Sequence, residues 1–396
     1  MNTLDNVLLP QLQQRQQQNL WRHHQLREGS QGIFQKIDGK NYLCFISNDY
    51  LGLAHHPDVI NALQQAATHY GVGSGASHIV NGHTLAHHEL ELALAKLAHR
   101  PAALLFSTGF MANLAVISTL CQRHDVVIHD RLNHASLLDG TQLSGAKLLR
   151  YRHVDINHCQ QILLECEDNK RKLLVTDGVF SMDGDIAPLK ELSELASKNN
   201  AWLMVDDAHG FGVLGENGGG IIEQDNLSTE QVPVVMGTLS KAFGCFGAFV
   251  AGSEILIETL RQFARPYIYT TAMPPALATA ALKAITISQQ ENWRRVHLQQ
   301  LIKQFRQGAT ELGLKLLPST TPIQPVIIGS NEDTLALGEK LKSQGILVGI
   351  IRPPTVPAGE ARLRISLSAD HKSEHITHLL ATLSNGFDST AYGLLK

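Results

Sequence analysis

A regular alternation of short apolar runs with helix-like stretches, between about residues 60 and 320, constrains the fold of this chain most. The apolar runs share a length typical of buried strands, and they are Ala103–Phe106, Val126–His129, Lys147–Arg150, Leu173–Thr176, Trp202–Val205, Val232–Met236 and Phe246–Ala251. Such runs, bounded by turn residues and separated by helical patterns, predict a mostly parallel sheet with helices on both faces. The fold class is therefore expected to be α/β.

After about residue 280 the pattern changes. A long amphipathic stretch, Leu298–Leu312, is followed by strand candidates at Pro325–Ile328, Ile346–Ile350 and Arg362–Leu367, and by a closing helix near Ser373–Leu383. This order of elements predicts a smaller C-terminal α+β domain.

The Gln-rich start of the chain, residues 1–30, predicts a helix that breaks at Gly29. We therefore expect an N-terminal helix and entry segment, a large domain and a small C-terminal domain, at residues 1–50, 51–285 and 286–396.

Charge and composition exclude several classes of protein. Lys and Arg total 33 against 36 Asp and Glu, and this balance argues against binding to nucleic acid or to a membrane surface. No apolar run is long enough to span a membrane, and the N-terminus shows no secretory signal. The five cysteines form no CxxC pair, which favours reduced thiols in a cytoplasmic enzyme.

The most familiar motifs do not fit. Gly71–Ala76 matches the dinucleotide-binding fingerprint, but it follows the helix-like segment Val59–Tyr70, where that fingerprint requires a strand. Neither a GxxxxGK[ST] phosphate loop nor a GxSxG elbow occurs. His83 and His87 are four residues apart without an HExxH motif, and the adjacent histidine pairs cannot easily share one ion, so we expect no metal ligands.

Two predicted strands end in groups that suit a cofactor. Trp202–Val205 leads into Asp206 and then His209, and in open α/β sheets ligands bind at the carboxyl ends of strands. Val232–Met236 leads into a polar turn with Lys241, whose apolar surroundings favour a neutral, nucleophilic amine. Each group alone has an ordinary alternative: Asp206 could cap a helix, and Lys241 could extend to solvent.

Three further strand ends offer Ser181, His134 and the turn Ser107–Gly109, which enters a helix. Free N–H groups at such a helix start suit a phosphate, although ordinary turn or cap chemistry explains each segment in isolation. A phosphate cradle, a lysine for a Schiff base, an aspartate for a ring nitrogen, and His and Ser for ring substituents together match pyridoxal 5'-phosphate.

The sequence at this point resembles the α-oxoamine synthases, which are fold-type-I pyridoxal-phosphate enzymes. The matching segments extend over nearly the whole chain, and they are Ser47–Leu53, Gly73–Ser77, Asn133–Ser136, Asp177–Gly184, Val205–His209 and Gly237–Lys241. In that family an amino acid and an acyl thioester condense with loss of CO2. The resemblance therefore implies a pyridoxal-phosphate-dependent acyltransferase.

Two segments narrow the substrates that the resemblance implies. Gly109-Phe110 stands where glycine-using relatives usually carry Cys-Phe, and Arg352–Pro357 followed by Ala361–Ser366 resembles members that use L-alanine with pimeloyl-CoA or pimeloyl-acyl carrier protein. A 2-amino-3-ketobutyrate CoA ligase, a quorum-signal or lipid-base synthase, and a non-catalytic binding protein on the same scaffold remain as alternatives.

The resemblance also implies roles at the cofactor. Lys241 would carry it as a Schiff base, Asp206 would keep its pyridine nitrogen protonated, His209 would hydrogen-bond its phenolic oxygen, and His134 would stack on its ring. The remaining cofactor contacts would come from Gly109, Phe110 and Thr238 on the phosphate side and from Ser181 at the ring oxygen.

Substrate contacts and a shared dimer site follow from the same resemblance. Arg364 is expected to bind the amino-acid carboxylate, with Arg362 as the alternative because both face the same way on a regular strand. The substrate entrance would be lined by Asn48, Arg22 and Thr355. We expect a homodimer in which Thr270 or Thr271 reaches the partner's phosphate, unless these residues only cap the next helix.

Overall fold

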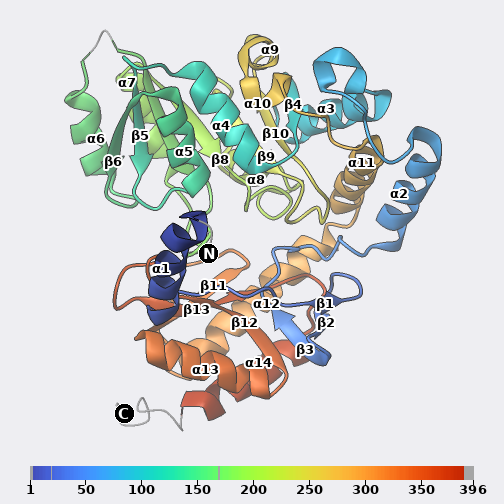
Figure 1. The fold of residues 1–396 in the computed structure, drawn as a ribbon, viewed down its shortest axis with the longest axis vertical. Helices are drawn as coiled ribbons and strands as arrows, with labels where there is room; N and C mark the ends of the chain where they lie inside the picture. The colour runs from blue at the N-terminus through green and yellow to red at the C-terminus, as the bar shows by residue number, and fades with distance from the viewer. Residues whose placement is uncertain (1–2, 19, 168–169, 388–396) are drawn as a thin grey trace.

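The structure is a computed structural model that describes residues 3–18, 20–167 and 170–387, and it has two lobes (Figure 1). The larger lobe contains a seven-stranded sheet and the smaller lobe a six-stranded sheet. The candidate site residues are drawn from strand ends of the larger sheet and from one strand of the smaller sheet.

The larger sheet contains all seven strands expected from the apolar runs. They are β4 (Ala102–Phe106), β5 (Val126–Asp130), β6 (Lys147–Tyr151), β7 (Lys172–Asp177), β8 (Ala201–Asp206), β9 (Val234–Thr238) and β10 (Ala248–Gly252). Their spatial order is β4-β10-β9-β8-β7-β5-β6. Only β10 is antiparallel to its neighbours, so the prediction of a mostly parallel sheet is confirmed.

Successive side chains of each strand enter different cores, because they point to opposite faces of a sheet. Leu104 belongs to one buried cluster and Leu105 to the other. The Leu104 face is covered by α4 (Gly109–Leu120), α5 (Ala135–Ser144), α9 (Glu254–Phe263) and α10 (Arg265–Ile268). The Leu105 face is covered by α2 (Pro57–Tyr70), α3 (Leu85–Leu97), α6 (Ile156–Leu164), α7 (Leu189–Lys198), α8 (Gly220–Asp225) and α11 (Pro275–Gln290). The predicted layers of helix, sheet and helix are therefore present.

The smaller sheet combines both ends of the chain. Its strands, in spatial order, are β1 (Arg27–Glu28), β2 (Phe34–Ile37), β3 (Lys40–Phe45), β12 (Ile346–Ile351), β13 (Ala361–Ser366) and β11 (Ile323–Gly329). β3 pairs in parallel with β12, with Leu43 opposite Ile346. Strands β1–β3, from the segment expected to hold the N-terminal helix and entry, therefore belong to the same sheet as the C-terminal strands.

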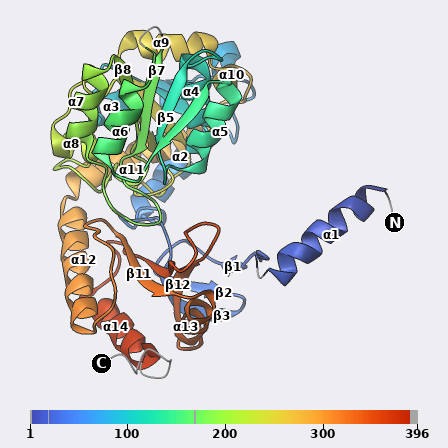
Figure 2. The ribbon, with the colours of Figure 1, turned by 90° about the vertical axis from the view of Figure 1, so that its left-hand side faces the viewer.

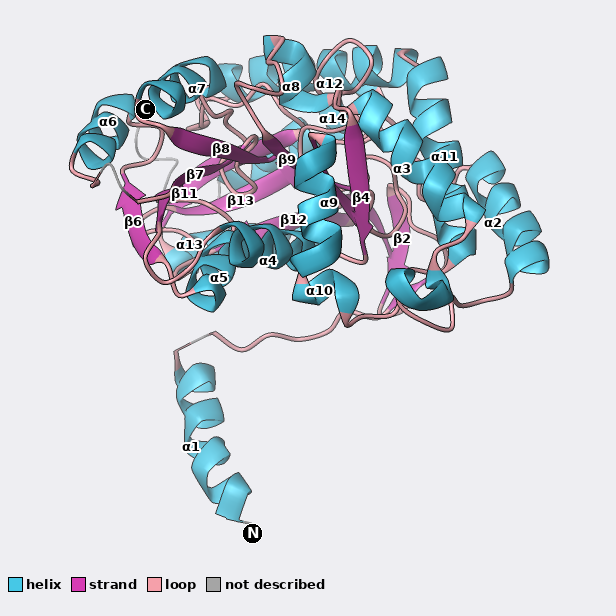
Figure 3. Ribbon diagram, turned by 90° about the horizontal axis from the view of Figure 1, so that it is seen from above, coloured by secondary structure: helices cyan, strands magenta, loops and turns pink. Residues whose placement is uncertain are grey.

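Helices α12 (Trp293–Glu311), α13 (Asn331–Ser343) and α14 (Ser373–Phe387) belong to the smaller lobe (Figures 1 and 2). The N-terminal helix α1 (Thr3–Gln17) ends well before the expected break at Gly29 and projects from the body of the chain (Figures 2 and 3). None of its residues is buried, so no tertiary packing extends it. Among the described residues, no helix is long and apolar enough to cross a membrane.

The segment Gly71–Ala76 follows α2, which ends at Tyr70. The helix expected before this glycine-rich stretch is therefore present. No strand leads into it, so its context is not that of a dinucleotide-binding site.

Candidate active site

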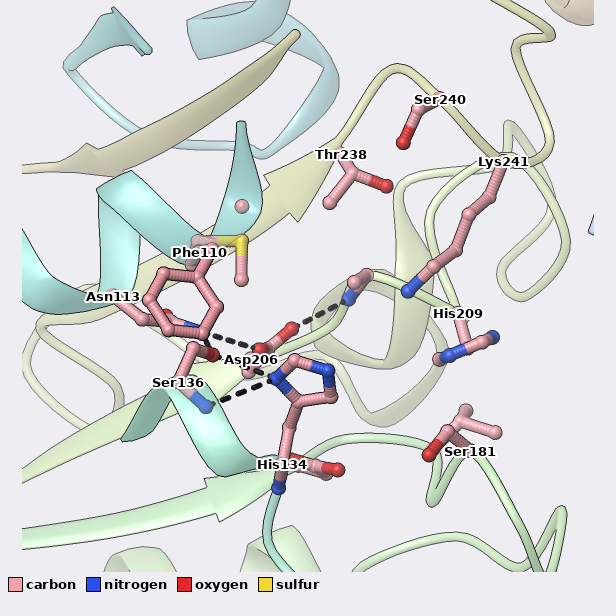
Figure 4. A pocket seen from close by; sticks show the side chains of 15 residues that line it. Phe110, Asn113, His134, Ser136, Ser181, Asp206, His209, Thr238, Ser240 and Lys241 are labelled. Carbon is pink, nitrogen blue, oxygen red and sulfur yellow. Dashed lines mark hydrogen bonds between the residues drawn. The ribbon is translucent and has the colours of Figure 1, made fainter. Parts of the chain in front are cut away.

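A cavity of about 180 Å³ lies where the strands of the larger sheet end (Figure 4). β4, β5, β7, β8 and β9 run in the same direction, so their carboxyl ends, or the turns that follow them, meet there. The lining residues are Gly109, Phe110, Asn113, His134, Ser136, Asp177, Val179, Ser181, Asp206, Ala208, His209, Met236, Thr238, Ser240 and Lys241. All eight residues expected at the cofactor are thus brought together.

Lys241 lies in the turn that follows β9, and its side chain extends into this cavity (Figure 4). Burial lowers the pKa of Lys241 from 10.5 to about 8, although the charges of Asp206 and Asp177 act in the opposite direction. About a tenth of the amine is therefore neutral at pH 7, far more than for an ordinary lysine, and the neutral amine is the form that attacks a carbonyl group.

Asp206, the last residue of β8, presents a buried carboxylate to the cavity. Its Oδ2 accepts a hydrogen bond of 2.7 Å from Nδ2 of Asn113, and its Oδ1 accepts one of 3.1 Å from the Ala208 N–H. The neighbouring Asp207 points elsewhere, because its Oδ2 accepts from the Ile221 N–H at 2.8 Å and it does not line the cavity. Of the two adjacent aspartates, only Asp206 can meet a ligand in this cavity.

His134 precedes α5 and caps it, which fixes the orientation of its imidazole. Its Nδ1 lies 2.7 Å from Oγ of Ser136, and its backbone N–H donates to Oδ1 of Asp177 at 3.2 Å. Burial, together with the charge of Asp206, raises the pKa of Asp177 well above its usual range. The His134 ring is therefore held at the cavity wall with its flat face available to a ligand (Figure 4).

His209 is buried and its ring is held from behind by a tyrosine. The hydroxyl of Tyr50 lies 2.7 Å from Nδ1 of His209. Burial, with the charges of Lys241 and Arg364, lowers the pKa of His209 well below its usual value. A neutral imidazole with one nitrogen engaged leaves Nε2 for a ligand in the cavity.

The end of the cavity near α4 has the features of an anion site. Thr108 caps α4 by accepting a hydrogen bond of 3.2 Å from the Met111 N–H, and the helix then begins at Gly109 beside the cavity. A Cβ on Gly109 would lie 2.9 Å from Cγ2 of Thr238, so only glycine fits at this position without movement. Oγ1 of Thr238 is buried and has no hydrogen-bond partner among the described residues. This orphan hydroxyl is available to a bound phosphate.

The two arginines of β13 differ in their partners. Arg362 pairs with Asp183 at 2.7 Å and with Glu360 at 3.0 Å, so its charge is already neutralised. The buried Arg364 binds only neutral groups, namely the Ser181 carbonyl at 2.7 Å, the Ser366 hydroxyl at 2.7 Å and Oδ1 of Asn48 at 3.2 Å. Arg364 therefore has the uncompensated charge that a substrate carboxylate needs.

None of the four expected substrate contacts is part of the cavity lining. Asn48 lies beside Arg364, whereas Arg22 and Thr355 are exposed and contact neither the cavity nor this pair. Thr270 and Thr271 do not cap α11, because Pro274 occupies the N-cap position without a side-chain hydrogen bond. The capping alternative for these threonines is therefore wrong.

The cavity is also lined by residues for which no role was predicted from the sequence. Asn113 holds Asp206, Ser136 holds His134, and Ser240 lines the phosphate end. A helical spacing of four residues from Gly109 to Asn113 places both on one face of α4, and this signal could have identified Asn113. Tyr50 carries no such signal, because it is far from His209 in the sequence.

Comparisons with known proteins agree with this geometry. A family model described as aminotransferase class I and II matches residues 40–383. A solved serine palmitoyltransferase variant from S. paucimobilis, with a bound PLP–myriocin aldimine, is 32% identical and superimposes with a TM-score of 0.92, covering 99% of each chain. The chain therefore belongs to the aminotransferase class I and II family, and the fold-type-I resemblance is confirmed.

Within that family the chain is similar to one particular group of enzymes. The 8-amino-7-oxononanoate synthase of Cellvibrio japonicus (strain Ueda107) is 58% identical over 388 residues, which cover 98% of this chain and 97% of the relative. A solved 8-amino-7-oxononanoate synthase from Francisella tularensis is 36% identical, with a TM-score of 0.77 over 87% of this chain and 97% of the other.

Proposed function

We propose that this enzyme condenses L-alanine with a pimeloyl thioester to give 8-amino-7-oxononanoate, CO2 and a free thiol, as a step of biotin biosynthesis. It is a pyridoxal-phosphate-dependent acyltransferase. The observation that carries the proposal is the convergence of Lys241, Asp206 and His209 on one cavity at the strand ends. The identity with the 8-amino-7-oxononanoate synthases over nearly the full chain supports the choice of substrates.

The residues present fit pyridoxal 5'-phosphate. The orphan hydroxyl of Thr238 and the start of α4 suit its phosphate, the buried carboxylate of Asp206 suits its ring nitrogen, and Nζ of Lys241 would carry it covalently. Gly109 leaves open the space that any larger residue would fill. When bound, this cofactor supplies an electron sink for negative charge at the α carbon of the amino acid.

Lys241 also moves a proton. With Nζ free, the amine of Lys241 would take the proton from the α carbon of the amino acid and later return one. A pKa of about 8 places this amine close to the operating pH, where a general base transfers protons most efficiently.

The other groups hold charges and orient the ring. Asp206, supported by Asn113, would keep a proton on the pyridine nitrogen. His209 would hydrogen-bond the phenolic oxygen, while Tyr50 fixes the histidine ring from the opposite nitrogen. The flat ring of His134, fixed by its capping contact, would stack on the cofactor ring and limit its tilting.

Arg364 binds the carboxylate of L-alanine, because guanidinium and carboxylate groups can pair through two parallel hydrogen bonds. Its neighbour Asn48 can then accept from the same guanidinium group. We place Arg22 and Thr355 at the thioester entrance by resemblance alone, and the acyl carrier is either CoA or an acyl carrier protein.

We further propose a homodimer in which the segment Tyr269–Thr271 reaches the partner's site. Tyr269 and Thr271 are exposed, and no capping role occupies the threonines. A two-fold dimer would present each loop to the other chain reciprocally. The cytoplasmic location stays a prediction.

Thiol release with L-alanine and pimeloyl-CoA tests the proposal, with glycine and acetyl-CoA as the control pair. We expect turnover with the first pair and little with the second. The reverse preference would favour a 2-amino-3-ketobutyrate CoA ligase, and inactivity of the folded, cofactor-loaded protein with every pair would favour a binding protein.

A further inference from the structure

A second cluster of ligand-type side chains lies outside the cavity, at the start of α3. Ring nitrogens of His83 and His88 and a carboxylate oxygen of Glu91 all lie within 4.8 Å of one another. His88 and Glu91 are three residues apart on α3, which places them on one face of the helix. His83 follows the π-helix His78–Gly82, so two different elements meet at this cluster.

The carboxylate of Glu91 is only half satisfied. The residue is buried, and its Oε1 accepts the Leu105 N–H at 3.0 Å. Its Oε2 makes no hydrogen bond within the described part of the chain, and Nε2 of His83 lies 3.9 Å away, which is too far for one. Burial raises the pKa of Glu91 to about 7. A buried carboxylate oxygen thus faces an imidazole nitrogen across a gap.

The width of this gap suits a metal ion. Zinc lies about 2.0–2.1 Å from imidazole nitrogen and about 2.0–2.2 Å from carboxylate oxygen, so its two ligand atoms can be up to about 4.3 Å apart. The observed 3.9 Å falls inside that limit. Small side-chain movements would bring the ligand atoms to the closer spacing of a tetrahedral site.

The neighbouring His87 is not available as a ligand, although it is also close. Its Nδ1 lies 3.0 Å from the Thr84 backbone nitrogen, whose N–H it accepts, and its Nε2 lies 2.7 Å from the Met273 carbonyl. Both nitrogens of this ring are therefore committed to the capping of α3 and to the loop before α11.

His78 acts as a support for His83. The Nδ1 atoms of the two rings are 3.0 Å apart, and the His78 ring stacks on Tyr267. Metal-bound histidines usually use their second ring nitrogen in such a hydrogen bond, which fixes the tautomer. When His83 donates through Nδ1, the lone pair of its Nε2 faces Glu91.

We propose that His83, His88 and Glu91 bind a divalent cation of the zinc class. Two imidazoles and one carboxylate are ligands that zinc prefers, and the exposure of both histidines leaves a fourth position to water. Arg261 of α9 contributes an unfavourable positive charge, but it is paired with Glu258.

The sequence did not predict this site. The search of the sequence for metal sites relied on the HExxH motif, which is lacking. His83 lies outside helix α3, and the turn before α3 brings it to the other two ligands. The proposed ion would tie this turn to α3, whose His87 holds the loop that leads into α11.

Equilibrium dialysis with ZnCl2 tests the site in the cofactor-loaded enzyme after removal of any affinity tag. We expect one zinc ion per chain. His83→Ala, His88→Ala and Glu91→Gln should each weaken binding by about 100-fold or more, since loss of a supporting contact alone costs about 10- to 100-fold. The matched control His69→Ala changes an exposed histidine on α2 and should bind zinc as the original chain does.

Co2+ absorption gives a second readout, because a tetrahedral site produces strong visible bands that should be lost in His88→Ala. His88 is exposed, and Glu91→Gln keeps an oxygen that can accept the Leu105 N–H, so these variants should fold. Binding of His88→Ala with unchanged affinity, or no stoichiometric zinc in the original chain, would overturn the proposal.

Discussion

Replacement of Asp206 by Asn is the perturbation that best tests the proposed chemistry. The amide has almost the same shape, and its oxygen can still accept the Ala208 N–H. In Asp206→Asn, the amide nitrogen at position 206 would face Nδ2 of Asn113, and two donors cannot pair. A flip of the Asn113 amide would bring its Oδ1, which has no hydrogen-bond partner among the described residues, to that place as an acceptor. Ser136, which now accepts from Asn113, can donate its one hydroxyl proton to that oxygen only by giving up its contact of 2.7 Å with Nδ1 of His134. We therefore expect a stability change within about 1 kcal/mol, the net value of one hydrogen bond.

The catalytic loss should be larger than the loss of stability. The substitution removes the negative charge that keeps the pyridine nitrogen protonated. One charge-assisted hydrogen bond contributes about 1.5–3 kcal/mol, which corresponds to a loss of about 10- to 150-fold in kcat/KM. This range is a minimum, because stabilisation of negative charge at the α carbon depends on the same proton.

The assay is thiol release from pimeloyl-CoA at saturating L-alanine, with urea unfolding as the measure of stability. Asp207→Asn is the matched control. Burial raises the pKa of Asp207 well above its usual range, and the side chain lies outside the cavity, so Asp207→Asn removes no charge that would face a ligand there. Full activity of Asp206→Asn together with loss of activity in Asp207→Asn would refute the assignment of the pyridine partner.

Three further predictions follow from named contacts. Lys241→Ala should fold but lose turnover, and mixing it with a Thr270→Ala/Thr271→Ala chain should restore some activity; no recovery despite subunit exchange would contradict a shared site. Arg364→Ala should raise the KM for L-alanine by about 10-fold or more, the value of one charge-assisted contact, and an unchanged KM would exclude it as the carboxylate ligand. His153 bonds Asp130 and Asp185, and the hydrogen bonds to both carboxylates outweigh burial and raise its pKa from 6.5 to about 10. The free energy of unfolding should therefore exceed that of His153→Gln by its full amount below pH 6.5, and this difference should disappear as pH rises through 10. Urea unfolding that shows no such loss would contradict the prediction.

The larger sheet could be predicted because its signal is local. Each strand is a short apolar run, because a strand that is buried on both faces of a sheet carries apolar side chains at nearly every position. The pairing of β3 with β12 joins segments about 300 residues apart, and no local pattern in Lys40–Phe45 indicates which strand it will meet. The same reason explains why residues 1–50 were expected to form a separate segment.

The residues of the site also divide into those with a local signal in the sequence and those without one. Asp206 and Lys241 could be predicted because each follows a strand, and topology then places strand ends together. Asn113 and Ser136 act through contacts with those residues, so they become recognisable only when the neighbouring elements are in place. Tyr50 approaches His209 from a loop 159 residues earlier in the sequence.

The arginine pair of β13 shows why the strand period of the sequence alone was insufficient. Arg362 and Arg364 alternate on one strand and face the same way, so no sequence pattern could separate them. Their partners come from distant segments: Asp183 neutralises Arg362, whereas Arg364 meets only neutral oxygens. A buried cation without a counter-ion is costly unless a ligand supplies the charge. A carboxylate bound to Arg364 would therefore remove the cost of burying its unpaired charge. Arg362 gains nothing comparable from a ligand, because Asp183 already neutralises it.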